Sequence, residues 1–414
     1  MRILLAAIYP YVFLLLYLTI PFDDYIRALP NILVAILVVA FPFVVKKEDF
    51  QKLKSPAIVL FIGFLIYLVI NSIFGGRLLT DFNIIKKVLI VAGLAILYIP
   101  VNDANSPAGR TGKINGAIIF SALAAIIFTV YNFVLITHKT GHFALGDSPE
   151  IIESLLIDRL YLGLLSVFSI VISFQAIRKK YHPNNNYYLA NIFINLLFII
   201  LIGSKIALIS IFVLVLIQQF YGQPRVWKVV IGVVALVAVL GLLFLIKNEN
   251  VNRNLASESP NSPPAFIENT LTYELRAVVW KSAANISDEE GFLLTGIGFD
   301  QTKDRLVLEY KSSIADAKKR DRFVSERYNT HNQFLDFYLS AGLLALIIFL
   351  IFIGASFIAT RKQFLPTAML SILILYCLVE NLFNRQIGAY YVGFILIVLM
   401  TSARTSKNNE IKEI

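Results

Sequence analysis

The sequence has little cysteine and little charge. The one cysteine, Cys377, lies inside an apolar run, so no disulfide can form within the chain and a thiol mechanism has little support. Charged residues make up only 15% of the chain, against about a quarter in soluble globular proteins. With 57% hydrophobic residues and a mean hydropathy of +0.73, this composition excludes an ordinary soluble domain.

The sequence also lacks the motifs by which enzymes usually hold nucleotides or metal ions. It has no Walker-type lysine loop, the G-x-G in "GIGFD" has no strand–helix frame, and no D-x-D pair suggests a metal-bound sugar nucleotide. His138 and His142 stand four residues apart, but Gly141 and the loop context argue against a metal site. We therefore expect no metal, no cofactor and a substrate that is already activated.

Apolar runs of about twenty residues recur along the chain, and each is long enough to cross ~30 Å of hydrocarbon as a helix. The chain is predicted to be an all-α polytopic membrane protein with about twelve transmembrane helices. We expect these helices at residues 3–20, 29–45, 56–74, 84–100, 114–137, 159–177, 187–203, 205–221, 227–246, 334–359, 364–383 and 386–402. The seventh and eighth are joined only by "IGSK" and could form one broken helix.

The distribution of Lys and Arg among the loops predicts the orientation in the membrane. If the N-terminus is cytoplasmic, every inside loop is basic, as in "KKEDFQKLK", "RKKYH" and "PRVWK". The longest of the short outside loops, "HKTGHFALGDSPEIIESLLID", is acidic. The formal net charge of +10 is thus a matter of topology and does not indicate nucleic acid. Both termini are expected in the cytoplasm, and the first apolar segment lacks a small-residue cleavage site, so it is expected to remain as a helix.

One hydrophilic loop, residues 247–333, is much longer than the others and falls outside. Its start, "NENVNRNLASESPNSPP", is expected to be flexible, whereas "TYELRAVVWKSAANI" has apolar residues at helical spacing and "YKSSIADAKKRDRFVSER" is expected to be helical. The expected organisation is helices one to six at 1–186, helices seven to nine at 187–246, the loop at 247–333, helices ten to twelve at 334–402 and a cytoplasmic tail at 403–414.

The return of this loop to the membrane, "YNTHNQFLDFYLSAGLL", carries polar residues at the mouth of an apolar helix expected to start at about Asn332. The positive end of the helix dipole favours neutral imidazole, so His331 could be a general base. Asn332 and Asp336 share one helix face, and an aspartate there is costly unless it faces protein or water. The alternative is an interfacial helix cap with a polar anchor.

Two further cations could contact an anion. Arg276 stands four residues before Trp280, and a guanidinium suits phosphate because it offers a forked pair of donors and keeps its charge. The alternative is an ordinary ion pair with Glu274 or another neighbour. Lys205, in the apolar stretch "LIGSKIALIS", either borders a water-filled cavity or snorkels from a tight turn.

More polar residues are expected on the same outer side, at helix ends. They are Arg159 in "IDRLYLGLL" and the group Glu380, Asn381 and Arg385 in "VENLFNRQIGAYY". The predicted topology therefore collects several cations and one base near one face: Arg159, Lys205, Arg276, His331 and Arg385. Such a group describes a site for a phosphorylated lipid head group.

Four motifs carry a resemblance to a known family: "LRAVVW", "LLTGIGFDQ", "THNQFLDFYLSAGLLAL" and "ENLFNRQIGAYY". Together with the long late loop, they resemble the bacterial O-antigen ligase and O-antigen polymerase (Wzy-type) family. Apart from the fourth motif, which lies at residues 380–391, the similarity covers about residues 187–345. The family consists of membrane glycosyltransferases that use undecaprenyl-pyrophosphate-linked glycans. By matching position, the resemblance implies that His331 acts on the acceptor hydroxyl and Arg276 on the donor pyrophosphate. The family often carries Ser-Arg where this chain has Ser204-Lys205, and lysine lacks the forked geometry.

The resemblance implies a metal-independent, inverting lipid-linked oligosaccharide glycosyltransferase on the periplasmic face of the cytoplasmic (inner) membrane. The donor would be an undecaprenyl-pyrophosphate glycan, and the acceptor lipid A–core or a growing glycan. Arg276, Lys205, Arg159 and Arg385 would bind the pyrophosphate, with Asn332, Asp336, Trp280 and Glu380 in support. The alternatives are a protein O-oligosaccharyltransferase, a lipid-linked glycan transporter or flippase, and a scaffold.

Overall fold

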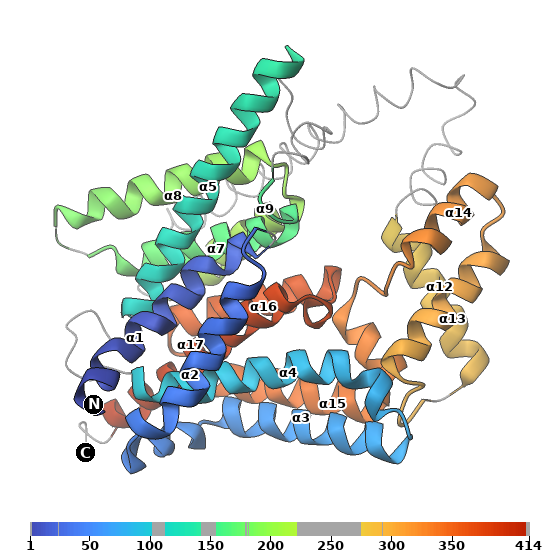
Figure 1. Cartoon of the computed structure of the whole chain (residues 1–414), viewed down its shortest axis with the longest axis horizontal. Coiled ribbons are helices and arrows are strands. Elements are labelled where there is room, and N and C mark those ends of the chain that lie inside the picture. The colour runs from blue at the N-terminus through green and yellow to red at the C-terminus, as the bar shows by residue number, and fades with distance from the viewer. Residues whose placement is uncertain are drawn as a thin grey trace.

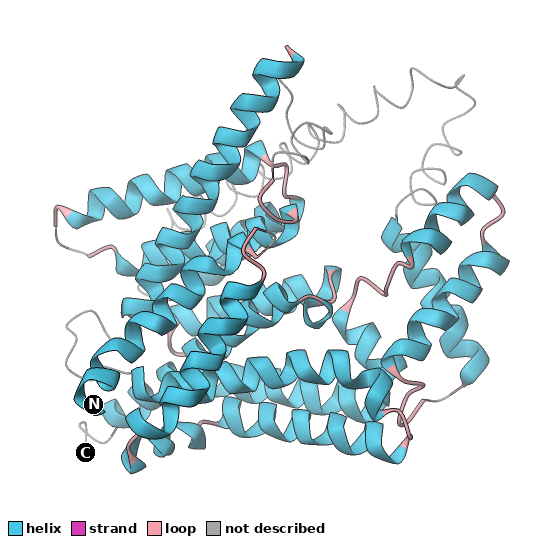
Figure 2. Cartoon of the chain, viewed as in Figure 1, coloured by secondary structure: helices cyan, strands magenta, loops and turns pink. Residues whose placement is uncertain are grey.

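A computed structural model shows a helical protein whose helices are joined by loops, with no strand in the part of the chain that it describes (Figure 2). The structure describes residues 2–23, 25–101, 112–141, 155–178, 180, 182–221, 275–291 and 293–410. The start of the long loop, His142, Glu274 and the helix expected at 227–246 lie outside these residues.

The apolar helices follow the expected order (Figure 1). They are α1 (Arg2–Thr19), α2 (Ala28–Val44), α3 (Pro56–Phe74), α4 (Leu78–Tyr98), α5 (Gly112–Thr140), α7 (Arg159–Ala176), α8 (Asn184–Leu201), α9 (Lys205–Gln219), α15 (Gln333–Thr360), α16 (Phe364–Val379) and α17 (Gln386–Glu410). Short 3₁₀ helices are η1 (Ile20–Phe22), η2 (Lys47–Lys54), η3 (Ile99–Val101) and η4 (Leu382–Asn384). The all-helical class is confirmed, and α8 and α9 are separate helices.

The described helices identify a multi-pass membrane protein. Six of them are long and apolar enough to cross a membrane, or seven if α2 and η2, bent by 118°, form one span. Helices α9, α16 and the apolar part of α17 are shorter. The count of twelve spans and the orientation therefore stay predictions.

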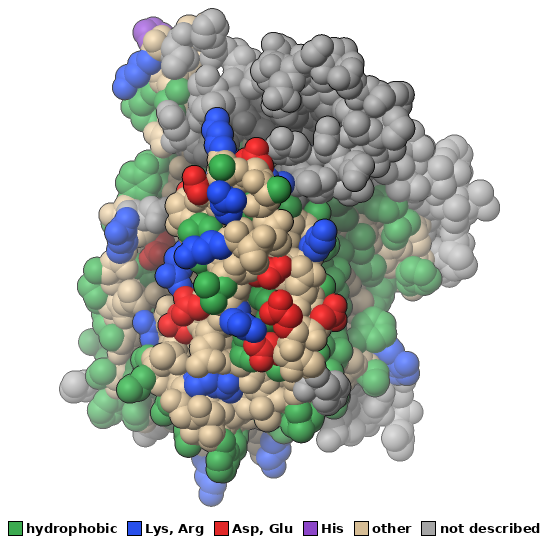
Figure 3. Space-filling view, turned by 90° about the vertical axis from the view of Figure 1, so that its right-hand side faces the viewer, with side chains coloured by type: hydrophobic (Ala, Val, Ile, Leu, Met, Phe, Trp, Pro, Cys, Tyr) green, Lys and Arg blue, Asp and Glu red, His purple; other side chains and the backbone are tan. Residues whose placement is uncertain are grey.

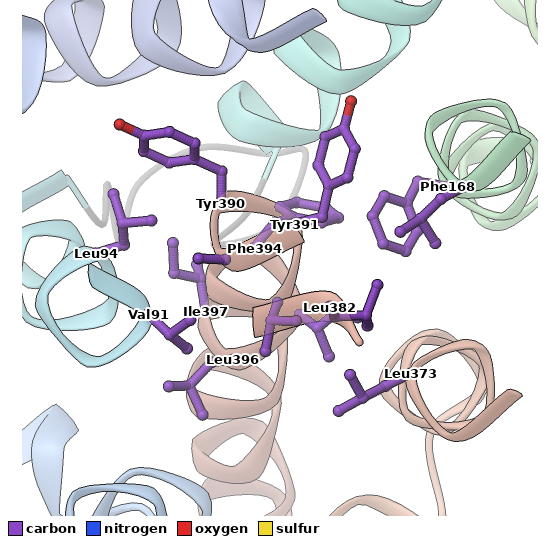
Figure 4. Close-up of a cluster of buried hydrophobic side chains, with 14 of the residues drawn as sticks. Val91, Leu94, Phe168, Leu373, Leu382, Tyr390, Tyr391, Phe394, Leu396 and Ile397 are labelled. Carbon is purple, nitrogen blue, oxygen red and sulfur yellow. The ribbon is translucent and has the colours of Figure 1, made fainter. Parts of the chain in front are cut away.

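Helix α17 lies among α4, α7, α15 and α16 and organises the apolar core. Figure 4 shows Phe394 and Ile397 of α17 between Val91 of α4 and Phe168 of α7, with Leu373 of α16 nearby. All five side chains are almost fully buried. Their contacts hold together helices that are far apart in sequence, so the ends of α7, α16 and α17 have fixed relative positions.

The described part of the long loop forms a small helical unit at one end of the molecule (Figure 1). It consists of α12 (Leu275–Glu290), α13 (Phe299–Ser313) and α14 (Ala317–Glu326), around a second apolar cluster that includes Val279, Leu306 and Phe323. Its outer surface carries mixed basic and acidic side chains (Figure 3). The charged stretch expected to be helical is interrupted between α13 and α14, where the side chain of Asp316 caps α14 by accepting from the Lys319 amide.

The helix that follows His331, α15, is broken at Gly342, where φ is 88° and ψ is 175°. The preceding turn, residues 293–298, lies across the break. The Ile297 amide donates to the Leu339 carbonyl and the Leu343 amide to the Leu293 carbonyl, both at 2.8 Å. Gly296 and Gly298 of this turn have positive φ, and the turn satisfies backbone groups that the break exposes.

Residues of α3, of α4 and of the loop between them hold this turn in place. The Asn71 side chain donates to the Thr295 carbonyl at 2.9 Å, and the Arg77 guanidinium donates to the Gly296 carbonyl at 2.8 Å. The buried carboxylate of Asp81 accepts from the Phe299 amide at 2.8 Å. The α12–α14 unit is therefore attached to the membrane helices by specific polar contacts next to the break.

Gly342→Ala should destabilise the protein strongly. A Cβ at Gly342 would lie 2.2 Å from the Leu294 carbonyl oxygen, and the backbone conformation alone costs an alanine about 1–3 kcal/mol. Gly354→Ala in the same helix is the matched control, because nothing lies within 4 Å of its added Cβ. Thermal unfolding in detergent should show a lower Tm for Gly342→Ala only. Equal Tm values for the two variants would contradict the observed break.

Candidate functional site

The segment Val379–Arg385, between α16 and α17, is where the candidate residues meet. The helix expected over 364–383 ends at Val379, and Glu380 is extended, with φ of −154°. The helix ends here because polar groups of the following residues, 380–384, bond to other elements and do not continue the helix. We call this segment the α16–α17 turn.

His331 lies beside this turn in a sparsely populated backbone conformation, with φ of 44°. The Asn329 side chain accepts from its amide at 2.9 Å, and the Tyr328 ring lies 6.0 Å from the imidazole, between centroids. A non-glycine residue in this region is strained and persists only where its surroundings impose the conformation, and such residues cluster at functional sites.

The Glu380 carboxylate contacts the imidazole directly. The distance from His331 Nδ1 to Glu380 Oε2 is 3.1 Å, and the side chains are only 20% and 14% exposed. An ionised carboxylate can only accept, so Nδ1 carries a proton in this contact. The other ring nitrogen, Nε2, is buried and has no hydrogen-bond partner among the described residues. With Nδ1 as the donor, a neutral imidazole carries its lone pair on Nε2.

Three further contacts fasten the loop and neighbouring helices to the α16–α17 turn. The buried side chains of Thr330 and Asn381 exchange hydrogen bonds of 2.9 and 3.1 Å. The Gln333 side chain accepts from the Phe383 amide at 3.1 Å. In addition, the buried ammonium of Lys87 in α4 donates to the Asn384 carbonyl at 2.6 Å. These bonds fix the position of His331 relative to Glu380.

Asn332 and Asp336 bond to groups other than the imidazole. Asn332 is the N-cap of α15, where its side chain accepts from the Phe334 and Leu335 amides at 3.0 and 3.1 Å. Asp336 is buried and accepts from the Gln333 side chain at 3.4 Å. The structure therefore places these two residues in the helix start, and Glu380 is the carboxylate that contacts His331.

Two guanidiniums approach the turn from different elements. Arg276, in the first turn of α12, donates from Nε to the Val379 carbonyl at 3.2 Å. Arg159, at the start of α7, lies near enough for the two like charges to repel each other. Bringing two cations together costs energy that a bound anion would offset.

The remaining predicted cations lie around α7. Arg385 pairs with Asp158 at 3.3 Å, and its guanidinium lies over the Tyr161 ring at 5.9 Å from the centroid. Lys205 is the exposed first residue of α9. The preceding residue, Ser204, packs tightly on α7, since a Cβ added to Gly163 would lie 2.5 Å from its Oγ. The lysine thus starts its helix beside the first half of α7.

Trp280, in α12, contacts the backbone just before His331. Its indole Nε1 donates to the Thr330 carbonyl at 3.0 Å, next to His331. It also lines an open apolar groove between α12 and α15. The other lining residues are Asn332, Phe334, Leu335, Tyr338 and Leu346.

The sequence alone did not single out Lys87 or Thr330. Lys87 lies in a predicted membrane helix, and the rarity of charged residues there was a usable signal. Thr330 had no comparable signal, because only the fold brings it to Asn381.

The exchange between Thr330 and Asn381 should appear as an energetic coupling. Thr330→Val or Asn381→Leu alone leaves a buried polar partner unsatisfied. Each should lower the free energy of unfolding by about 1–3 kcal/mol. The double variant should lose less stability than the sum of the two single variants, with a coupling energy of about 0.5–3 kcal/mol. The measurement is a double-mutant cycle of stability in detergent. Strictly additive effects would show that the pair does not interact.

One comparison with known proteins matches part of this chain. Residues 190–350 match the family model described as O-antigen ligase. No curated protein matches the chain. The matched range includes α12, His331 and the broken start of α15, and the resemblance found in the sequence is confirmed. This part of the chain is therefore similar to the O-antigen ligase family, a glycosyltransferase-like family of ligases and polymerases.

Proposed function

We propose that this protein transfers a glycan from undecaprenyl pyrophosphate to a sugar hydroxyl, on the periplasmic face of the cytoplasmic membrane. The observation that carries the proposal is the orientation of the His331 ring. Glu380 holds Nδ1, and the buried Nε2 has no partner in the described part of the chain. A general base needs this arrangement: one nitrogen oriented by a carboxylate and the other open to the proton that it removes.

In the proposed reaction, His331 Nε2 takes the proton of the acceptor hydroxyl as that oxygen attacks the anomeric carbon of the donor. The new carbon–oxygen bond forms while the bond from the anomeric carbon to the phosphate oxygen breaks. Undecaprenyl pyrophosphate leaves, and a single displacement inverts the anomeric centre. Glu380 stabilises the imidazolium that forms, as the acid partner of histidine does in catalytic triads.

The cations stabilise the charge that develops on the leaving pyrophosphate. Arg276 and Arg159 contribute guanidiniums from two different elements, and the electrostatic repulsion between them supports an anion in this region. Arg385 and Lys205 are proposed as further contacts. The Arg276 contact with Val379 leaves other donors of its guanidinium for the ligand, since this group has five N–H donors.

The three acceptors used with this donor chemistry are lipid A–core, the end of a growing glycan, and protein. We propose a ligase or a polymerase, with transfer to protein as the third possibility. A deletion strain separates the first two on a lipopolysaccharide gel. Loss of a ligase leaves bare core, whereas loss of a polymerase leaves core with a single repeat.

His331→Ala should abolish long surface glycan in cells that lack the native gene, because no other described side chain replaces Nε2 next to Glu380. His138→Ala is the matched control, since His138 is exposed in the last turn of α5. Both variants should accumulate in the membrane at wild-type levels. Wild-type amounts of long glycan with His331→Ala would refute His331 as the base.

A further inference from the structure

The phenol of Tyr161 is a buried polar group that the proposed reaction does not use. Tyr161 is the third residue of α7 and only 1% exposed. Its hydroxyl is buried and has no hydrogen-bond partner in the described ranges. Leaving such a group unsatisfied costs about 1–3 kcal/mol, and native proteins rarely do so without a functional reason.

Charged groups of the candidate site surround this phenol. Glu380, Arg385 and Asp158 all lie within electrostatic range of it. The Arg385 guanidinium lies over the ring, 5.9 Å from the centroid. Glu380 is also the partner of His331, so two unsatisfied polar groups, His331 Nε2 and the Tyr161 hydroxyl, lie around one carboxylate.

Other buried phenols lack these surroundings. Tyr376 of α16 is also fully buried, and its hydroxyl also has no partner among the described residues. However, no charged side chain acts on Tyr376 within the described structure. An unsatisfied hydroxyl alone is therefore not diagnostic, and the combination with the charged site distinguishes Tyr161.

The chemistry of the neighbours selects the ligand atom. A buried phenol is neutral and donates one hydrogen bond. Three guanidiniums, those of Arg159, Arg276 and Arg385, lie near this end of α7 and favour an anionic acceptor. Phosphate oxygens are the anionic acceptors in the donor of the proposed reaction.

We infer that the Tyr161 hydroxyl is a further binding group for the lipid-linked donor, to which it donates a hydrogen bond at a phosphate oxygen. The inference rests on the proposed function, because that function supplies the phosphate. The hydroxyl would add a neutral hydrogen-bond donor to the cations. The cations compensate the charge of the phosphate, and the hydroxyl orients it.

The test is binding of undecaprenyl pyrophosphate to the purified full-length protein in detergent. Tyr161→Phe removes only the hydroxyl and should weaken binding roughly tenfold, the loss expected for one hydrogen bond to a charged group. Tyr376→Phe is the matched control and should bind as the wild type. Replacing Tyr161 by 4-aminophenylalanine restores a donor and should recover most of the affinity. Inorganic pyrophosphate is the second probe. If the hydroxyl contacts phosphate and not the lipid, the variants should bind pyrophosphate with the same order of affinities.

Stability separates this role from a structural one. Without ligand, Tyr161→Phe should be as stable as the wild type or more stable, because it removes an unsatisfied group. A lower Tm for ligand-free Tyr161→Phe, or unchanged binding by it, would overturn the inference. His331→Ala should bind normally and lose only transfer. If His331→Ala transfers normally while Tyr161→Phe still binds weakly, the proposed mechanism fails but the binding role does not.

Discussion

The α16–α17 turn must satisfy its polar groups in largely apolar surroundings, and the site depends on how it does so. Buried backbone and side-chain groups without partners are costly. Here the partners come from the long loop and from α4: Thr330 for Asn381, Gln333 for the Phe383 amide, and Lys87 for the Asn384 carbonyl. The same bonds that stabilise the turn therefore bring His331 to Glu380.

A second constraint positions the start of α15. Its break at Gly342 exposes backbone groups, and residues 293–298 satisfy them while residues of α3 and of the loop before α4 hold this segment in turn. The α12–α14 unit is thus attached to the membrane helices through residues 293–298. Arg276 also belongs to this unit, so the attachment of the unit also positions Arg276 for its contact with Val379. In the proposed reaction, rigid attachment of this kind would hold the base and the cations at fixed relative positions.

Much of the fold could be predicted because lipid leaves few choices. A membrane-spanning segment must satisfy its backbone internally, so long apolar runs predict helices, and the runs within the described residues are helices. The end of α16 could not be predicted, because Leu382 and Phe383 continue the apolar pattern while Glu380 and Asn381 bond elsewhere. The broken α15 is similar, since only the contact with residues 293–298 explains its φ at Gly342.

The candidate site was partly predictable for a related reason. Intramembrane and interfacial charges are rare, so Arg159, Arg276, His331, Glu380 and Arg385 stood out, and the structure gathers them around the α16–α17 turn. Their pairing was not predictable. Asn332 and Asp336 precede and follow the helix start and were the natural support for His331, yet the contact comes from Glu380, which lies 49 residues away. Sequence periodicity reports neighbours within one helix and carries no information on such a contact.

The central claim is that Glu380 orients His331 so that Nε2 serves as the base. The most direct test is the steady-state transfer rate of Glu380→Gln in the purified protein, with lipid-linked glycan as donor. Glutamine keeps an acceptor for Nδ1 but removes the charge that stabilises the imidazolium, so kcat should fall roughly 100-fold with little change in the KM for the donor. A kcat equal to that of the wild type would contradict the account.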